Sequence, residues 1–301
     1  MSAIGPSPLT PDMSLRAAEV GGSVESSSPA DRQADPSVTG SPSSVGETRT
    51  LEVRQLVKSF GGVHALDGVT LHADRGMVTA LVGENGAGKS TLIKCLVGVL
   101  QPDSGQILVE GRPSHFANPI DARLAGLETV YQDLALAQNL DVASNVFLGR
   151  EVHGGARRLW RLNKRKMATQ SSEMLESFGI RGLAPSTLVR SLSGGQRQAV
   201  SIARATGWGT RAVIMDEPTA ALGVRESERV LEEIIKLVKR NVAILLVSHN
   251  IPQVLEVSDH IWILRAGRLV AHLKTAETNH AEVVAHITGI SETRLPLTSA
   301  R

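Results

Sequence analysis

The sequence contains one cysteine, few aromatic side chains and no apolar run long enough to cross a bilayer. A single cysteine in 301 residues rules out a disulfide within the chain and suits a reducing compartment. Aromatic residues make up only 3% of the chain, so aliphatic side chains must fill the core, as they do around buried parallel strands. A membrane-spanning helix needs about 20 consecutive apolar residues, and the sequence has no such run.

The sequence also lacks a strong charge of either sign. Its 32 basic and 30 acidic residues leave a net charge of +2, which gives no support to general nucleic-acid binding. The first residues lack the basic and apolar stretches of a secretory signal, and we therefore expect a cytoplasmic protein. Cys95 lies in an apolar, helix-like stretch, which favours a small core residue over a reactive thiol.

Composition and periodicity divide the chain into a tail and one α/β domain. Residues 1–47 hold six of the 13 prolines and show no hydrophobic periodicity, which predicts a disordered tail. We expect an ordered domain over 48–292 and a short tail over 293–301. Apolar runs at 78–83, 211–217 and 241–249 alternate with helical patterns, which is typical of buried parallel strands. Helical spacing over about 118–205 predicts an inserted helical subdomain.

The stretch GENGAGKST fits the phosphate-binding pattern G-x-x-x-x-G-K-[ST] between a predicted strand and a predicted helix. Glycines in such a loop let backbone N–H groups surround phosphates, while Lys89 can reach the β- and γ-phosphates and Ser90 can bind Mg²⁺. A chance glycine turn is the alternative, but the whole pattern in this context argues against it. The nucleotide-binding residues predicted here are Gly83, Glu84, Asn85, Gly86, Ala87, Gly88, Lys89, Ser90 and Thr91.

Two carboxylates end the apolar strand predicted in RAVIMDEPTA. Ligands bind at the carboxyl ends of strands in open parallel sheets, which places Asp216 and Glu217 beside the phosphates. Asp216 is expected to hold Mg²⁺, and Glu217 to position or deprotonate the attacking water. A solvated acidic turn is the alternative. Successive strand residues point in opposite directions, so we expect the two carboxylates to have different tasks.

A third motif, SLSGGQ, places two glycines at the start of a predicted helix. Unpaired N–H groups and the helix dipole make such a start an anion site. Taken with GENGAGKST and IMDEPTA, LSGGQ resembles the signature of the ATP-binding cassette (ABC) ATPase family over roughly residues 50–290. The resemblance implies a P-loop core with a mixed sheet and flanking helices, an antiparallel β subdomain and an inserted helical signature subdomain. It assigns ATP contacts to Ser193, Gly194, Gly195 and Gln196.

The resemblance also assigns three residues outside these motifs. Phe60 in VKSFGG matches the aromatic residue that stacks on adenine, although it could be a plain core aromatic. Gln132 in VYQDL matches the glutamine that touches Mg²⁺ and reports to the membrane subunit. His249 in LLVSHN matches the histidine that contacts the γ-phosphate, whereas a lone histidine there would more often be structural.

In the resembled family two cassettes meet head to tail, so the signature helix of one chain contacts ATP held by the other. One chain has one of each half-site, which makes a homodimer the simplest expectation. The sequence departs from the family at Gly223, where an aspartate is usual in the loop that crosses the dimer. We still expect hydrolysis, because the phosphate, Mg²⁺ and water-binding residues are all present.

The stretches at 131–151 and 217–227 resemble the ATPases of bacterial monosaccharide importers, of the ribose, galactose, xylose or fructose type. The resemblance implies a peripheral ATPase on the inner face of the cell membrane, bound to a separate permease and indirectly to a sugar-binding protein. Residues 132–150 are expected to face the permease. The basic stretch at 157–166 could touch lipid or nucleic acid, but a solvated basic face is the ordinary reading.

Two other classes of protein stay open at this point. A soluble ABC factor acting on ribosomes or DNA usually has two cassettes or a long coiled-coil insertion, and neither is evident. A P-loop kinase is disfavoured by LSGGQ. An importer for another small solute is compatible with every motif, and the sequence does not specify the sugar.

Overall fold

The computed structural model describes residues 49–154, 161–177, 180, 182–220 and 222–290. The tails predicted at 1–47 and 293–301 lie outside the described residues. Within the described part of the chain, no helix is both long enough and apolar enough to cross a membrane.

A mixed sheet with the strand order β10-β9-β3-β8-β7-β6 forms the centre of the domain. Strands β6, β7, β8, β3 and β9 run parallel, and β10 pairs with β9 in the opposite direction. The strands are β3 (Val78–Val82), β6 (Leu127–Val130), β7 (Ala212–Asp216), β8 (Ala243–Val247), β9 (His260–Arg265) and β10 (Arg268–Lys274). Every residue of β3 and β8 is buried, as the continuous apolar runs predict.

A second sheet is antiparallel, with the strand order β2-β1-β4-β5. Its strands are β1 (Arg49–Phe60), β2 (Val63–Asp74), β4 (Ser104–Val109) and β5 (Arg112–Ser114). The two sheets share a core in which Leu71 and Ile107 pack with Leu81 and Leu245. The mixed sheet and the antiparallel sheet confirm the predicted fold class.

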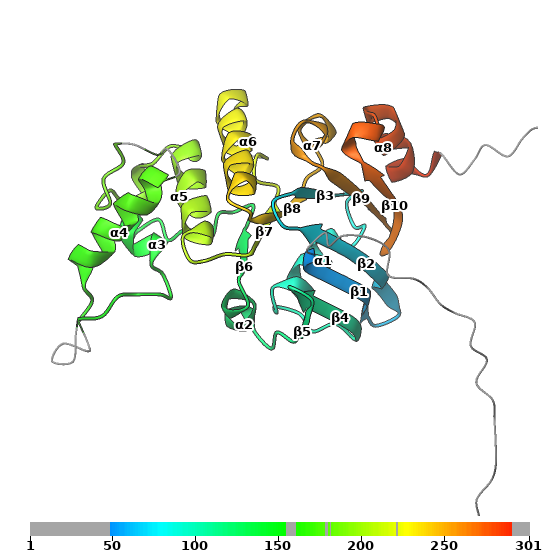
Figure 1. Ribbon diagram of the computed structural model, residues 1–301, viewed down its shortest axis with the longest axis horizontal. Helices are drawn as coiled ribbons and strands as arrows, with labels where there is room; N and C mark the ends of the chain where they lie inside the picture. Colours follow the sequence, from blue (N-terminus) through cyan, green and yellow to red (C-terminus); the bar gives the residue numbers. More distant parts are fainter. Residues whose placement is uncertain (1–48, 155–160, 178–179, 181, 221, 291–301) are drawn as a thin grey trace, which may run out of the picture. The chain divides into compact units, whose positions relative to one another are not determined.

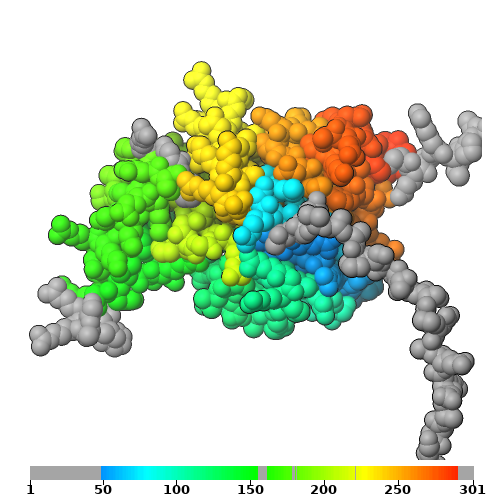
Figure 2. Space-filling model, viewed as in Figure 1, coloured from blue at the N-terminus to red at the C-terminus, as the bar shows by residue number. Residues whose placement is uncertain are grey.

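The helices cover the mixed sheet and form the segment between β6 and β7 (Figure 1). The structure has α1 (Lys89–Leu96), α2 (Pro119–Leu124), α3 (Val142–Val146), α4 (Lys164–Ser177), α5 (Gly194–Thr206), α6 (Val224–Lys239), α7 (Ile251–Val257) and α8 (His280–Thr288), with short 3₁₀ turns η2 (Val189–Ser191) and η3 (Thr275–Glu277). Figure 2 shows α6, in yellow, between the green segment that contains α5 and the orange segment that contains α7.

The helical pattern predicted over about 118–205 is wrong in one place. Residues 127–130 form β6, which pairs with β7 in the mixed sheet, for example Thr129 with Ile214. The helix that begins at Pro119 ends at Leu124, and the chain then turns through Gly126 with φ 89°. Helices α3, α4 and α5 follow β6 in the sequence. The bounds of the inserted helical subdomain stay a prediction.

Cys95 is 1% exposed on the buried face of α1, which confirms its prediction as a core residue. Burial raises the pKa of its thiol to about 11. The thiol is therefore protonated near neutral pH and is a poor nucleophile.

Candidate nucleotide-binding site

The predicted site residues follow the carboxyl ends of adjacent parallel strands. The phosphate loop begins directly after β3, Glu217 directly after β7, and His249 two residues after β8. The strand ends are level, because Val247 lies opposite both Leu81 and Asp216 in the sheet. Gln132 follows β6 in the same way. One edge of the sheet therefore collects residues that lie far apart in the sequence.

Two glycines of the phosphate loop have no room for a side chain. A Cβ on Gly83 would lie 2.1 Å from the carbonyl oxygen of Leu264, and a Cβ on Gly88 would lie 2.4 Å from that of Ala65. Both have positive φ, at 157° and 110°, and Gly88 is the N-cap of α1. The loop thus packs closely on the backbone at Ala65 and Leu264, and it ends at the first N–H groups of α1. A glycine-rich loop that leads into a helix N-terminus is an arrangement that binds phosphate.

The ammonium group of Lys89 lies inside this loop. Its Nζ donates to the carbonyl oxygens of Gly83 at 2.7 Å and Glu84 at 2.9 Å. Partial burial lowers the pKa of Lys89, while the charges of Glu217 and Asp216 act in the opposite direction. Lys89 is therefore close enough to Asp216 and Glu217 for their charges to affect its pKa.

Asp216 and Glu217 differ in environment, as their alternation along the strand predicts. Burial and the neighbouring charge of Glu217 raise the pKa of Asp216, against the effect of Lys89. Glu217 leaves the strand geometry with φ 52°, and its Oε2 lies 2.6 Å from Nδ1 of His249. The side chain of Glu217 is 15% exposed and that of His249 is 68% exposed, so the histidine covers the carboxylate from the solvent side.

A hydrogen bond that no sequence motif indicates joins the turn after Glu217 to helix α7, which follows His249. The hydroxyl of Thr219 donates to Oε1 of Gln253 at 2.7 Å, and the backbone N–H of Gln253 donates to the side chain of Asn250, which caps α7. Asparagine before a helix is a recognisable N-cap, but nothing in the sequence connects Thr219 with Gln253.

Phe60 ends β1 and is 50% exposed, which excludes the alternative that it is a core residue. The Nζ atom of Lys58 lies 5.8 Å from the centre of its ring. An exposed aromatic face is available for stacking on a base.

The loop that contains Gln132 is attached to α5. The guanidinium of Arg204 donates to the carbonyl oxygens of Ala135 at 2.7 Å and Leu134 at 3.2 Å, and Ser201 also donates to Leu134. Gln132 itself is exposed. The helix that begins with the signature motif therefore holds the loop after β6.

Helix α5 includes both signature glycines, with Ser193 as its N-cap. The hydroxyl of Ser193 accepts from the N–H of Gln196 at 3.2 Å, and the N–H of Ser193 donates to Oε1 of Gln196 at 3.0 Å. This reciprocal pair is a capping box. Ser193 and Gly195 line one pocket, and Glu217 and His249 line another, so the signature motif and the Glu217–His249 pair lie in separate pockets of the chain.

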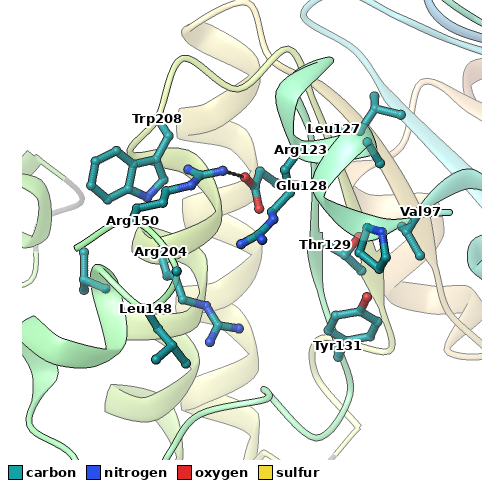
Figure 3. Close-up of a pocket in the computed structure, with 14 residues that line it drawn as sticks. Val97, Arg123, Leu127, Glu128, Thr129, Tyr131, Leu148, Arg150, Arg204 and Trp208 are labelled. Carbon is teal, nitrogen blue, oxygen red and sulfur yellow. Dashed lines mark hydrogen bonds and ion pairs between the residues drawn. The ribbon is translucent and has the colours of Figure 1, made fainter. Parts of the chain in front are cut away.

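A pocket of about 350 Å³ lies between α2, β6 and α5 (Figure 3). Arg123, Arg150 and Arg204 line it together with one carboxylate, Glu128, which is ion-paired with Arg150. Burial raises the pKa of Glu128 although all three arginines act to lower it. In the described structure Nη1 of Arg150 and Nε1 of Trp208 are buried donors without a partner. The three arginines are far apart in the sequence, which is why no motif revealed them.

The apolar residues of NLDVASNVFL divide between this pocket and the core. Val142, Val146 and Phe147 are buried, and Phe147 packs edge-on against Trp208 with ring centres 4.9 Å apart. Leu148 is 42% exposed and lines the pocket. Within the predicted permease-facing range 132–150, residues 142–147 are mostly buried, whereas the stretch before them and Leu148 and Gly149 after them are exposed or partly exposed. The basic stretch at 157–166 is described only from Arg161 on, where its basic side chains are exposed.

The phosphate loop, the strand-end carboxylates and the capped signature helix together define a P-loop nucleotide-binding domain. The sequence pattern of the ABC transporter family matches residues 66–220, and the chain belongs to this family. Its members bind and hydrolyse ATP, and this chain is accordingly an ATPase.

Three relatives show how far the likeness extends. The xylose/arabinose import ATP-binding protein of Sulfolobus acidocaldarius is 46% identical over 80% of this chain and 94% of its own length. The fructose import ATP-binding protein of Rhizobium meliloti is 45% identical over 80% of this chain and 95% of its own length. The ribose import ATP-binding protein RbsA 2 of Escherichia coli O157:H7 is 41% identical over 81% of this chain, which spans 47% of that longer protein.

Solved structures agree on the fold. A nucleotide-free ATP-binding cassette of an ABC transporter superposes with a TM-score of 0.68 at 25% identity, over 80% of this chain and 95% of its own. A second ABC transporter cassette gives a TM-score of 0.70 at 26% identity, over 81% and 98% of the two chains.

Proposed function

We propose that this chain is the ATP-hydrolysing subunit of a monosaccharide importer, working as a peripheral protein on the cytoplasmic face of the membrane. The observation that carries the proposal is the single sheet edge where Lys89, Asp216 and Glu217 share one environment and Glu217 pairs with His249. Relatives named for xylose/arabinose, fructose and ribose import support a sugar as the solute. A soluble factor acting on ribosomes or DNA is the alternative.

The residues present fit a Mg²⁺–nucleotide. Mg²⁺ prefers oxygen ligands and uses one or two carboxylates with phosphate oxygens, and Asp216, Ser90 and Gln132 offer a carboxylate, a hydroxyl and an amide oxygen. When bound, Mg²⁺ neutralises charge on the phosphates. The N–H groups at the start of α1 and the Lys89 ammonium bind the phosphate chain. Lys89 exchanges the carbonyl oxygens of Gly83 and Glu84 for phosphate oxygens.

Glu217 orients the attacking water and accepts its proton at a carboxylate oxygen. His249, through Nδ1, fixes the orientation of that carboxylate, and its exposed side chain is available to contact the γ-phosphate. Such positioning and charge stabilisation account for most of the catalysis in phosphoryl transfer.

Replacing Phe60 with alanine is expected to raise the KM for ATP by about tenfold, because base–aromatic stacking contributes about 1–3 kcal/mol. The free energy of unfolding should hardly change, since the ring is half exposed. A Phe60→Tyr variant keeps the stacking face and serves as the control. ATPase titrations of the three proteins check this, and an unchanged KM in the alanine variant would show that the ring does not bind adenine.

We further propose that two chains assemble head to tail around two ATP molecules. Each chain has one phosphate loop and one signature helix, and the signature residues Ser193 and Gly195 line a different pocket from Glu217 and His249 of the same chain. In the dimer Ser193 and the first N–H groups of α5 contact the γ-phosphate held by the partner chain. The helix start suits this task, since its dipole favours an anion.

The arginine-lined pocket in Figure 3 is the proposed docking site for the permease. Three arginines against one carboxylate, with two buried donors lacking a partner in the described structure, suit an acidic side chain of the docking segment. Arg204 lines this pocket and also holds the loop after Gln132. Arg204 therefore connects the proposed docking pocket to the loop that contains Gln132.

Co-purification tests the permease proposal. The tagged full chain, extracted from native membranes in mild detergent, should bring down a multi-span permease identified by mass spectrometry. Arg123→Glu, in the pocket, should abolish this, whereas Lys164→Glu, in an exposed residue of α4, should not. Recovery of ribosomes or nucleic acid without an integral membrane protein would refute the importer and favour the soluble factor.

A further inference from the structure

The signature glycines Gly194 and Gly195 pack against the segment that follows β7 and Glu217. A Cβ on Gly194 would lie 3.4 Å from Cδ2 of Leu222, and a Cβ on Gly195 would lie 3.1 Å from Cγ of Glu226 and 3.6 Å from its Cβ. The second contact is closer than side chains normally approach, so a larger residue at 195 would displace Glu226. Glycine at this position therefore lets the stem of Glu226 cover the start of α5.

The carboxylate end of the same side chain lies beside Gly223, the N-cap of α6. A Cβ on Gly223 would lie 2.7 Å from Oε2 of Glu226, so the carboxylate already occupies the space where a side chain at 223 would begin. Gly223 is extended, with φ −71° and ψ 170°, and provides no side-chain cap. Within the described residues, no hydrogen bond or ion pair engages this carboxylate.

The turn beside Glu226 is connected to Glu217 by backbone hydrogen bonds between residues close in the sequence. The N–H of Ala220 donates to the carbonyl of Glu217 at 3.2 Å, and that of Leu222 to the carbonyl of Thr219 at 3.2 Å. The N–H of Ser227 then donates to the carbonyl of Gly223 at 2.9 Å. Leu222, which lies against Gly194 at the start of α5, is thus connected to Glu217 by two overlapping backbone hydrogen bonds.

We propose that Glu226 is a positioning residue that fixes the start of the signature helix to the turn after Glu217. Its stem packs on Gly195, and its carboxylate supplies the acidic group that residue 223 lacks. Contact between the signature helix and the ATP held by the partner chain is thereby linked to the placement of Glu217, which acts on the ATP held by its own chain. The inference rests on the proposed head-to-tail dimer.

The simpler role for Glu226 is a helix-stabilising acid in the first turn of α6. That role affects stability alone. A positioning role also affects the cooperativity of ATP hydrolysis between the two sites, and the two roles are separated by the Hill coefficient for ATP.

The test measures steady-state ATP hydrolysis by the full chain, and ATP-dependent dimerisation, for the wild type and four variants. Glu226→Ala should lower kcat on the order of tenfold, as expected for a misplaced catalytic group, and bring the Hill coefficient to about 1. Gly223→Asp should be impaired as well, because its side chain meets the Glu226 carboxylate. The double variant Glu226→Ala/Gly223→Asp should recover kcat and cooperativity, since the carboxylate returns to the same place. Glu232→Ala, in an exposed residue of the same helix and pocket, should behave as wild type.

Wild-type kcat and Hill coefficient in Glu226→Ala, or a double variant at least as impaired as either single one, would overturn the inference. If Glu226→Ala fails to fold, Glu226→Gln, which has the same shape, must lower the Hill coefficient in the same direction, and an unchanged value refutes the proposal. Failure of the proposed function is distinguishable, because the wild type itself would then neither dimerise with ATP nor hydrolyse it.

Discussion

Glu217→Gln is expected to lower kcat for ATP hydrolysis by about 10²- to 10⁴-fold, the usual contribution of a positioned general base. The KM for ATP should change little, because the phosphate loop and Phe60 are untouched. Glutamine keeps the shape and can still contact Nδ1 of His249, so the fold should be preserved. Steady-state ATPase assays over a range of ATP concentrations measure both parameters.

Glu173→Gln, in an exposed acid of α4 outside the pocket that Glu217 and His249 line, is the matched control and should retain wild-type activity. The slow Glu217→Gln variant should also accumulate as a dimer with ATP, because hydrolysis no longer separates the chains. Hydrolysis unchanged in Glu217→Gln would defeat the proposed mechanism, and a variant that stays monomeric with ATP at micromolar concentration would defeat the proposed dimer.

Lys89→Ala should weaken ATP binding by about 10²-fold, since charge-assisted hydrogen bonds contribute about 1.5–3 kcal/mol each. The ammonium donates to two loop carbonyls in the present structure, which shows that it reaches the centre of the phosphate loop. Equilibrium binding of a fluorescent ATP analogue measures the loss. Lys94→Ala, in an exposed lysine of the same helix, is the control and should bind normally.

Mixing variants extends this prediction to the dimer. Lys89→Ala lacks a working phosphate loop, and Ser193→Asp keeps a helix cap but adds a negative charge where the γ-phosphate should contact α5. Each variant should be inactive alone. An equal mixture should recover about a quarter of wild-type activity, because half of the dimers are mixed and each has one intact site. No recovery would contradict head-to-tail assembly.

The sequence predicted the buried strands that carry the candidate site, because each motif directly follows a continuous apolar run. Short, continuously apolar runs such as Ala243–Val247 are typical of buried strands, and the carboxyl ends of parallel strands meet at one edge. The strand β6 was missed because it has four residues, half of them only partly buried, and because the apolar spacing of the preceding helix continues through Leu127 in the sequence. Its pairing with β7 is decided by residues more than eighty positions away, as Thr129 opposite Ile214 shows.

Contacts between distant segments account for the rest of what was missed. Glu226 lies in an amphipathic helix where a charged residue predicts a solvated face, yet its stem covers Gly195. The signature glycines predict an anion site from local chemistry, and their packing against Leu222 and Glu226 follows only from the fold. The arginine-lined pocket depends on three separate segments in the same way.

The central claim is that ATP hydrolysis by this chain powers sugar import, and uptake of labelled sugars tests it most directly. Uptake of ribose, galactose, xylose and fructose would be measured in cells that lack the chain and in cells that regain either the wild type or Glu217→Gln. The account predicts that uptake of at least one sugar is lost without the chain, restored by the wild type and not restored by Glu217→Gln. Equal uptake of all four sugars in every strain would contradict it.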